Sequence, residues 1–242
     1  MSKNKVEIIY EDDAIVIVNK PAHFLAIPDR YIAERPNLVD FLKKRFNEIF
    51  VVHRLDKETS GIICYAKNAE SHRQLSKQFE DRTVEKIYKV LVEGKMYEKS
   101  GVIDKPIARH TSIAGKMRIH NSGKNSVTHY EVEKYIGEYT LVQAEIKTGR
   151  THQIRVHFAA IGYPLMIDSM YGRQGAFLLS SIKQKKYNIG KDQEERPLMS
   201  RTTLHSWKLK LDHPVTDARM EFIAPPPKDF RAVLKQLEKW TG

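Results

Sequence analysis

The sequence contains a single cysteine, Cys64, among its 242 residues. One thiol excludes an intramolecular disulfide and argues against a cysteine-ligated zinc site, and it fits a reducing compartment. The charged N-terminus has no apolar signal region, and no stretch is long and apolar enough to span a membrane. We therefore expect a cytoplasmic protein without a membrane partner.

The motifs of several cofactor-dependent and metal-dependent enzymes are also missing. No glycine-rich phosphate loop of the P-loop or dinucleotide-binding type occurs, so ATP or NAD dependence has no support. The carboxylate clusters that metal-dependent nucleases use are absent. His152 and His157 do not have the spacing of two zinc ligands on one helix face. We expect neither a cofactor nor a metal.

Acidic residues are outnumbered by basic ones, 30 Asp and Glu against 41 Lys and Arg, which gives a formal net charge of +11. This balance favours a polyanionic partner such as RNA, DNA or an acidic membrane surface, although a basic protein without such a partner remains an alternative. The hydrophobic content of 41% allows a substantial core. We expect one domain over residues 1–242, with room for two lobes around a central cleft.

Hydrophobic periodicity and turn residues predict the order of the elements. Strands are expected at 6–10, 14–18, 62–66, 86–92, 128–135, 139–146, 203–211 and 219–223. Helices are expected at about 37–50, 68–80, 151–160 and 229–240, with Asn37 and Asn68 as N-caps. Residues 109–127 read as a basic loop or weak hairpin, and 173–201 as a long loop. Strands linked by hairpins with interspersed helices predict an α+β fold with a mixed, largely antiparallel sheet and flanking helices.

A polar loop, residues 53–61, leads directly into the strand expected at 62–66. A loop held against a sheet is a usual place for reacting groups. It carries Arg54 and Asp56, which point the same way if the chain is extended. Asp56 could act as a nucleophile, as a base or as half of a salt bridge, and a simple turn aspartate is the ordinary alternative.

The helix expected at 151–160 carries the second candidate group. Thr151, His152 and Arg155 share one face of such a helix, with apolar residues on another face. Arg155 would then leave the helix toward a polar site and could pair with a carboxylate. The alternative is a basic helix face in contact with solvent.

Tyr88 and two basic stretches complete the set of candidates. Tyr88 lies on the interior face of a predicted strand, where most tyrosines are core residues, but beside a cleft it could stack on a base. The stretches at 109–127 and 183–191 could hold phosphates, and solvated loops are the alternative for any single lysine.

These segments together resemble the RluA family of RNA pseudouridine synthases. The residues His53 to Gly61 resemble the signature loop of the family, and the likeness covers nearly the whole chain. The other similar segments are Asn19 to Ala22, Lys86 to Tyr88, Gly149 to His157, Asp168 to Gly172, Leu204 with His205, His213 with Pro214, and Ala224 with Pro225.

Two features depart from the pattern of the family or of some relatives. Ile167 stands where the family usually has glycine, and its β-branched side chain restricts the turn there. We also expect the small N-terminal RNA-binding domain that some relatives carry to be absent, because the sequence begins with the hairpin expected for the catalytic domain. We therefore expect RNA contacts to come from the catalytic domain and its basic loops.

The resemblance implies that uridine in ribosomal or transfer RNA is isomerised to pseudouridine without a cofactor. By similarity Asp56 is the essential catalytic carboxylate, Arg155 pairs with it, and Tyr88 stacks on the uracil or forms a hydrogen bond near it. Arg54 would fill the space that the flipped base leaves in the RNA. The residues expected to contact RNA are Arg54, His53, Thr59, Arg150, His152 and Gln153.

Two other functions are compatible with the same residues. A non-catalytic RNA-binding or chaperone protein on this fold would not need Asp56, Arg155 and Tyr88 together. A nuclease or glycosylase would need a group that activates water, and none is evident in the sequence. We expect a monomer, because no apolar stripe is left unassigned.

Overall fold

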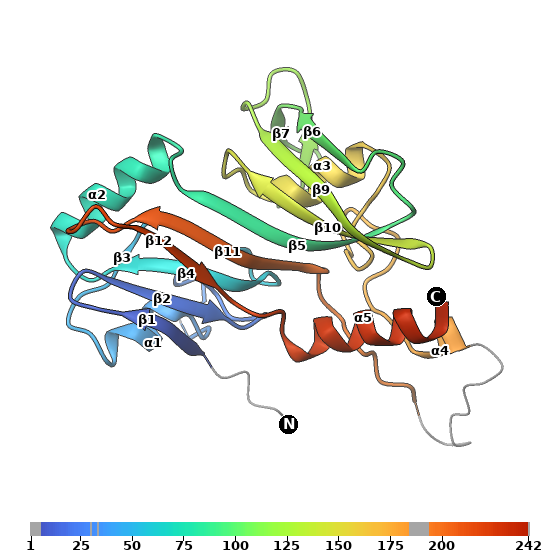
Figure 1. Cartoon of the computed structure of the whole chain (residues 1–242), viewed down its shortest axis with the longest axis horizontal. Helices are drawn as coiled ribbons and strands as arrows, with labels where there is room; N and C mark the ends of the chain where they lie inside the picture. The colour runs from blue at the N-terminus through green and yellow to red at the C-terminus, as the bar shows by residue number, and fades with distance from the viewer. Residues whose placement is uncertain (1–5, 30, 33, 184–193, 242) are drawn as a thin grey trace. The chain divides into compact units, whose positions relative to one another are not determined.

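The computed structural model describes residues 6–29, 31–32, 34–183 and 194–241, and it divides into two compact units (Figure 1). The first unit contains the residues up to Tyr88 and the segment His205–Pro225, and the second contains Lys89–Leu204 and the segment from Pro226 onward. Strand β5 (Glu85–Glu93) begins in the first unit and ends in the second. Each unit is therefore assembled from segments that are far apart in the sequence.

The first unit is built on a mixed sheet, as the sequence predicted. Its strands lie in the order β1-β2-β4-β11-β5, with β12 paired to β11 and β3 paired to β4. Among the pairs of labelled strands whose register is described within this unit, only β4 and β11 are parallel. The bounds are Glu7–Glu11 for β1, Ile15–Lys20 for β2, Phe50–Val51 for β3, Ser60–Ala66 for β4, Leu204–Asp212 for β11 and Arg219–Ile223 for β12.

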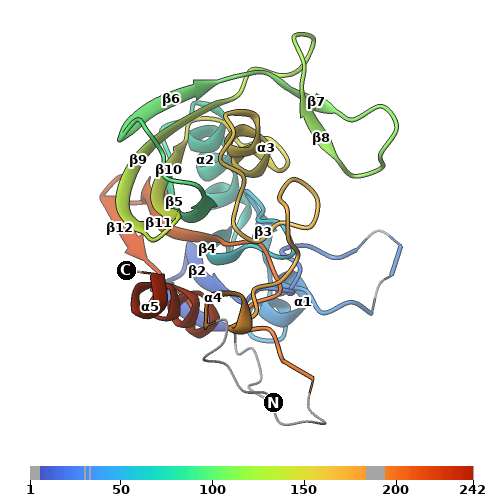
Figure 2. The ribbon, with the colours of Figure 1, turned by 90° about the vertical axis from the view of Figure 1, so that its right-hand side faces the viewer.

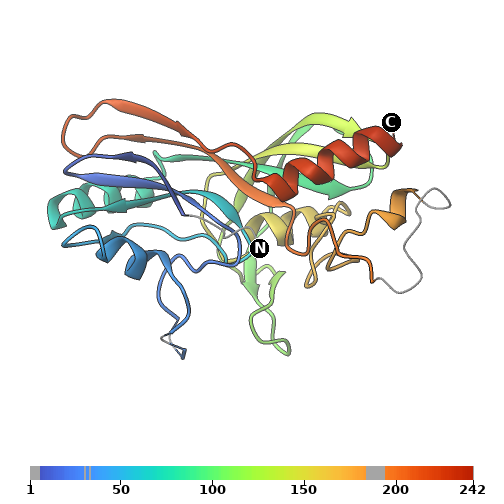
Figure 3. The same cartoon turned by 90° about the horizontal axis from the view of Figure 1, so that it is seen from below.

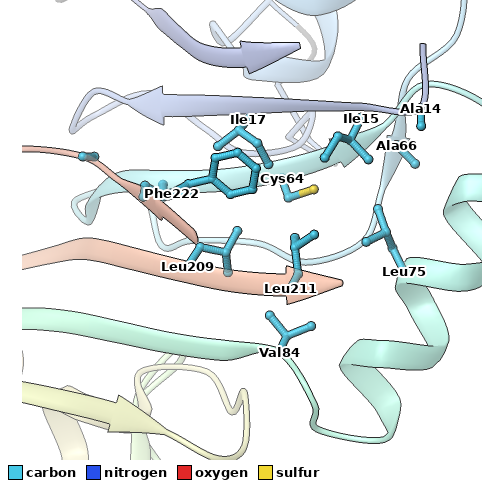
Figure 4. Close-up of a cluster of buried hydrophobic side chains, with 12 residues drawn as sticks. Ala14, Ile15, Ile17, Cys64, Ala66, Leu75, Val84, Leu209, Leu211 and Phe222 are labelled. Atoms are coloured by element: carbon cyan, nitrogen blue, oxygen red, sulfur yellow. The ribbon is translucent and has the colours of Figure 1, made fainter. Parts of the chain in front are cut away.

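The core of the first unit explains why β2 and β4 read as uninterrupted apolar runs. All seven residues of β4 are buried, as are Ile15 to Val18 on β2. A strand that is covered on both faces has no need of the alternating polar residues of a half-exposed strand. Helix α2 (Ala69–Glu80) contributes Leu75, and β12 contributes Phe222, to the cluster drawn in Figure 4.

Both predicted N-caps are confirmed, but one helix is much shorter than predicted. The side chains of Asn37 and Asn68 accept hydrogen bonds from the third residue of their helices. Helix α1 (Leu38–Lys43) ends well before residue 50. Phe46, within the predicted helix, lies beyond the end of α1 with the ammonium of Lys67 4.6 Å from its ring centroid, and β3 begins at Phe50. Pairing with β4 therefore extends the chain where periodicity alone favours a helix.

The second unit contains the predicted hairpin of β9 (Val127–Ile136) and β10 (Tyr139–Ile146). Its strands lie in the order β5-β10-β9-β6, and β6 (Ser100–Asp104) was not predicted. A separate two-stranded sheet joins β7 (Ile107–Arg109) to β8 (Met117–Ile119), so the basic segment forms a hairpin. The helices in the described part of this unit are α3 (Gln153–Ala160), α4 (Ser180–Lys183) and α5 (Lys228–Thr241). The basic stretch predicted at 183–191 lies almost entirely outside the described residues.

The core of the second unit lies between its sheet and α5, which Figure 3 shows running beside β9 and β10. Phe230, Val233 and Leu237 of α5 are buried in this core. Ile167 belongs to the same cluster, with 1% of its surface exposed, and is not among the described residues with a positive φ. The β-branched residue at this position therefore fits an ordinary backbone conformation. Within the described residues, no helix is both long and apolar enough to cross a membrane.

Candidate active site

The loop that carries Asp56 is fixed at its centre by Lys20, the last residue of β2. The Lys20 ammonium is fully buried and donates hydrogen bonds to three backbone carbonyls, including that of Lys57 at 3.2 Å. The N–H of His23 donates to the same Lys57 carbonyl at 2.8 Å. A buried charge needs such partners, because its desolvation is otherwise costly. The backbone directly after Asp56 is therefore held from two directions.

The end of the loop is anchored by a buried serine and histidine. His205 Nε2 lies 3.0 Å from the carbonyl oxygen of Ala224, so this nitrogen must carry the proton and donate. Nδ1 is then the acceptor, and the hydroxyl of Ser60 donates to it at 2.9 Å. Ser60 and His205 are both buried. The hydrogen bond to His205 thus holds Ser60, the first residue of β4, where the loop ends.

Gly61 allows β4 and β11 to approach each other at this point. Its φ is +112°, a conformation that side chains rarely adopt, and a Cβ atom here would lie 2.0 Å from the Ser206 carbonyl oxygen. Ser206 is also the parallel-sheet partner of Gly61. No other residue fits this position without displacing the backbone of β11.

His53 and Arg54, at the start of the loop, face different surroundings. The His53 ring stacks on Phe79 with centroids 4.6 Å apart, and its Nε2 accepts the N–H of Cys64 at 2.9 Å. Burial, aided by the nearby charge of Lys86, lowers the pKa of His53 to about 3. His53 is therefore a neutral packing residue, and its own contacts give no support to a role in RNA binding. Arg54 is exposed.

Tyr88 and Asp56 lie close enough to influence each other electrostatically. Tyr88 is 6% exposed, and burial raises its pKa above the ordinary value. A hydrogen bond with Ser206 opposes this rise in pKa, and the negative charge of Asp56 adds to it. The phenol thus stays protonated at neutral pH and is able to donate a hydrogen bond. Asp56 itself is half-buried.

Arg155, on α3 in the second unit, has a carboxylate partner that the sequence interpretation did not identify. Its Nε and Nη2 donate to Asp168 at 2.6 and 2.8 Å, a bidentate pair in which both residues are buried. Burial acts to raise the pKa of Asp168. Arg155 and the N–H groups of Met170 and Tyr171 outweigh this effect and hold the pKa below its ordinary value. The alternative of a solvated basic helix face therefore does not hold for Arg155, and pairing of Arg155 with Asp56 stays a prediction.

The predicted face of Thr151, His152 and Arg155 is also wrong, because α3 begins only at Gln153. His152 precedes the helix with φ 56° and ψ 20°, a left-handed conformation that costs free energy for a residue with a side chain. Its Nδ1 lies 2.9 Å from the hydroxyl of Tyr171. That contact fixes the direction of the imidazole at the start of the helix.

Two residues predicted to contact RNA, Gln153 and Thr59, are buried, and Gln153 belongs to an internal hydrogen-bond network. The Gln153 amide oxygen accepts from the Thr148 hydroxyl and the Arg150 N–H, and its nitrogen donates to Val127 and Thr128. Gln153 and Thr59 are 3% and 2% exposed. Neither side chain therefore belongs to the RNA interface proposed below. Arg150 is half-buried and donates through Nε to the Asn125 carbonyl at 3.2 Å.

Each unit brings together a part of the predicted set. His53, Arg54, Asp56, Thr59 and Tyr88 lie in the first unit, and Arg150, His152, Gln153 and Arg155 in the second. The sequence interpretation missed the supporting roles of four residues, Lys20, Asp168, Tyr171 and His205. All four lie in the segments that carry the family resemblance, and this was the available signal. No group of three or more potential metal-ligating His, Cys, Asp or Glu side chains occurs in the described part of the chain.

Comparison with known proteins identifies the family of this chain. Residues 14–160 match the model of a family described as RNA pseudouridylate synthase. The chain belongs to this family. This pseudouridine synthase is therefore an isomerase that converts uridine in RNA to pseudouridine.

Several relatives resemble this synthase over nearly its whole length. It is 36% identical over 241 residues to the ribosomal large subunit pseudouridine synthase D of Pseudomonas aeruginosa, covering 97% of this chain and 72% of that protein. It is 37% identical to an uncharacterized RNA pseudouridine synthase of Aquifex aeolicus, covering 97% and 73%. The solved structure of human RNA pseudouridylate synthase domain containing 1 is 28% identical, with a TM-score of 0.71 over 94% of this chain and 86% of that one.

Proposed function

We propose that the protein isomerises uridine in the RNA of the large ribosomal subunit and that Asp56 is its catalytic carboxylate. The observation that carries the assignment of Asp56 is its position in an anchored loop beside the buried phenol of Tyr88. Several relatives are named for the large ribosomal subunit, which favours this RNA over transfer RNA. We also propose that the enzyme acts as a monomer in the cytoplasm.

The reaction requires one bond to the ribose to break and another to form. The bond between ribose C1′ and uracil N1 breaks, the uracil turns, and C5 joins C1′ while the proton of C5 is lost and N1 gains one. Substrate and product contain the same atoms, so the overall change needs no oxidant, reductant or energy source. Asp56, as nucleophile or base, must be ionised for this chemistry. An anchored loop holds its carboxylate in one orientation relative to the substrate.

Arg155 is the proposed cationic partner of Asp56. A cation within about 4–6 Å favours the ionised form of a carboxylate. Asp168 supports this role by fixing the guanidinium plane with two hydrogen bonds. A lysine could not be held in the same way, because its ammonium has no planar fork.

Tyr88 and Arg54 are proposed to handle the flipped nucleotide. A uridine in folded RNA must leave its stack, at a cost of a few kcal/mol. The Tyr88 ring offers a stacking surface, and its protonated hydroxyl offers a donor near the uracil. The exposed guanidinium of Arg54 would occupy the space that the base leaves. Both roles rest on the resemblance to the family.

The RNA backbone is proposed to bind along the segment 105–126, which we name the basic hairpin. It contains five Lys or Arg residues and no Asp or Glu. Its basic residues are Lys105, Arg109, Lys116, Arg118 and Lys124. Each phosphate that such a residue neutralises would steepen the dependence of binding on salt. Arg150 and His152, next to the start of α3, are proposed as further contacts.

Mapping of pseudouridine at single-nucleotide resolution tests this function. Total RNA from cells with and without the gene would be compared, and one or more large-subunit positions should lose the modification. A plasmid with the wild-type gene should restore it, and one with Asp56→Asn should not. Restoration by Asp56→Asn would favour the non-catalytic RNA-binding alternative. Free uracil or strand breaks after incubation with RNA would instead indicate a glycosylase or nuclease.

A further inference from the structure

The basic hairpin is attached to the second unit at a few defined points. Figure 2 shows β7 and β8 projecting from the rest of this unit. The two strands form a small sheet of their own. At the base of the hairpin, His157 Nε2 donates to the Lys105 carbonyl at 3.0 Å. Further along, β8 meets a residue from a different segment, Tyr171.

Tyr171 contacts the hairpin through both its hydroxyl and its ring. The backbone N–H of Met117, the first residue of β8, donates to the Tyr171 hydroxyl at 2.8 Å. The ammonium of Lys116 lies 5.5 Å from the centroid of the Tyr171 ring. A displacement of β8 would therefore change the contacts of the Tyr171 side chain directly.

The same side chain supports the arginine proposed to act on Asp56. The Arg155 guanidinium carbon lies 5.0 Å from the centroid of the Tyr171 ring, within the range of a cation–π contact. The backbone N–H of Tyr171 donates to Asp168 Oδ1 at 3.0 Å, and Asp168 holds Arg155 in the bidentate pair. Tyr171 thus contacts Arg155 through its ring and supports the ion pair through its backbone.

The hydroxyl of Tyr171 can make both of its contacts at once. It accepts the N–H of Met117, so its own proton is available for His152 Nδ1 at 2.9 Å. His152 stands immediately before α3, the helix that carries Arg155, and its ring meets that of Tyr171 edge-on at 79°. The phenol therefore joins β8 to the start of α3 through two hydrogen bonds.

We propose that Tyr171 is a positioning residue that couples RNA bound on the basic hairpin to the orientation of Arg155. The inference rests on the proposed function, in which the hairpin binds RNA and Arg155 acts on Asp56. Binding free energy from parts of a substrate far from the reacting bond accelerates a reaction when it orders the catalytic groups. Here the connection runs from Met117 through the phenol to Arg155. Its loss should lower kcat more than it raises KM.

Tyr171→Phe tests the coupling, because it removes the hydroxyl and keeps the ring beneath Arg155. Tyr163→Phe is the matched control, since the Tyr163 hydroxyl also accepts a backbone N–H, that of Tyr97 at 3.3 Å, away from the hairpin. On a large-subunit RNA domain we expect Tyr171→Phe to lower kcat about 3–10-fold, as expected for hydrogen bonds of ordinary strength. KM should stay within about twofold, and Tyr163→Phe should match the wild type.

A shortened RNA distinguishes two roles of Tyr171: coupling of the basic hairpin to Arg155, and support of Arg155 that does not depend on the hairpin. The RNA would be trimmed until the exposed hairpin substitutions Arg109→Gln and Lys124→Gln no longer change KM, which shows that it no longer reaches the hairpin. With this fragment, Tyr171→Phe should have the kcat of the wild type. An equal loss of kcat on both RNAs, or no loss on either, would overturn the coupling while leaving the proposed function intact. A wild-type enzyme that forms no pseudouridine would instead overturn the proposed function.

Hydrogen exchange of the wild type provides a measurement that does not depend on a variant folding. RNA should slow amide exchange at Met117 and at Tyr171 together, because both N–H groups belong to the proposed connection. The trimmed RNA should slow exchange at neither. Protection at Met117 without protection at Tyr171 would contradict the coupling.

Discussion

Two aspartates, Asp56 and Asp168, differ in ways that their sequence context does not reveal. Asp168 is 1% exposed, and its two oxygens receive two hydrogen bonds from Arg155 and two from backbone N–H groups. Asp56 is only half-buried. A carboxylate whose acceptor positions are occupied inside the protein is an anchor, whereas one that keeps part of its surface accessible can meet a substrate. The comparison separates the supporting aspartate from the proposed reactive one.

The surroundings of the two aspartates are also stabilised differently. The Asp56 loop is held by backbone carbonyls around Lys20 and by the neutral pair of Ser60 and His205. Asp168 is held by an ion pair. Hydrogen bonds to backbone groups fix the position of a loop, but they do not compensate the charge of its reactive carboxylate. We expect substitutions in the two regions to lower the stability of the protein by different amounts and for different reasons.

The largest effect on stability is expected from Asp168→Asn. Removing one charge of a buried pair leaves the Arg155 guanidinium without a compensating charge, which typically costs about 3–5 kcal/mol of unfolding free energy. Urea denaturation would measure the loss. The matched control is Glu238→Gln, which breaks the exposed pair with Lys134 in the same unit and should cost less than about 1 kcal/mol. Equal losses from the two variants would contradict the anchoring role of Asp168.

A smaller loss is expected from Gly61→Ala in the loop of Asp56. The added Cβ would meet the Ser206 carbonyl at 2.0 Å, and the resulting strain should cost about 1–3 kcal/mol. Gly115→Ala provides the control, because Gly115 also has a positive φ but no atom within 4 Å of the added Cβ. Thermal unfolding of both variants measures the difference. A Gly61→Ala variant as stable as Gly115→Ala would show that the close approach of β4 and β11 is not required.

The smallest effect is expected in the pH dependence around His53. Its pKa falls from 6.5 to about 3 on folding, so between these values the unfolded chain binds the proton and the folded chain does not. This contribution to stability is therefore present above about pH 6.5 and declines as the pH falls toward 3. His53→Gln removes the titrating group and keeps an acceptor for the Cys64 N–H. Urea denaturation from pH 7 to 5 should show a steeper decline for the wild type, and parallel declines would contradict a His53 that is neutral in the folded state.

Much of the fold could be predicted because its elements carry local signals. The apolar runs of β2 and β4 and the asparagine caps of α1 and α2 each depend on residues close together in the sequence. The errors arose where a distant segment decides the structure. Phe50, predicted to end a helix, pairs with β4 as part of β3, and pairing with β9 makes β6 a strand.

The residues proposed to react were chosen from motifs, whereas the residues that support them were not. Asp56, Tyr88 and Arg155 were identified from motifs, but the bidentate partner of Arg155 lies 13 positions further along the chain and follows no local spacing rule. His53 and Gln153 looked like polar residues available to RNA. The stacking of His53 on Phe79 and the hydrogen-bond network of Gln153 around Thr128 depend on tertiary packing that the sequence does not display.

The central claim is that Asp56 is the carboxylate that reacts with the substrate. Single-turnover formation of pseudouridine by Asp56→Asn, at an enzyme concentration that saturates the RNA, tests this claim most directly. We predict a rate at least about 1,000-fold below that of the wild type, with RNA affinity and melting temperature nearly unchanged. A folded Asp56→Asn variant that converts uridine at the wild-type rate would contradict the account.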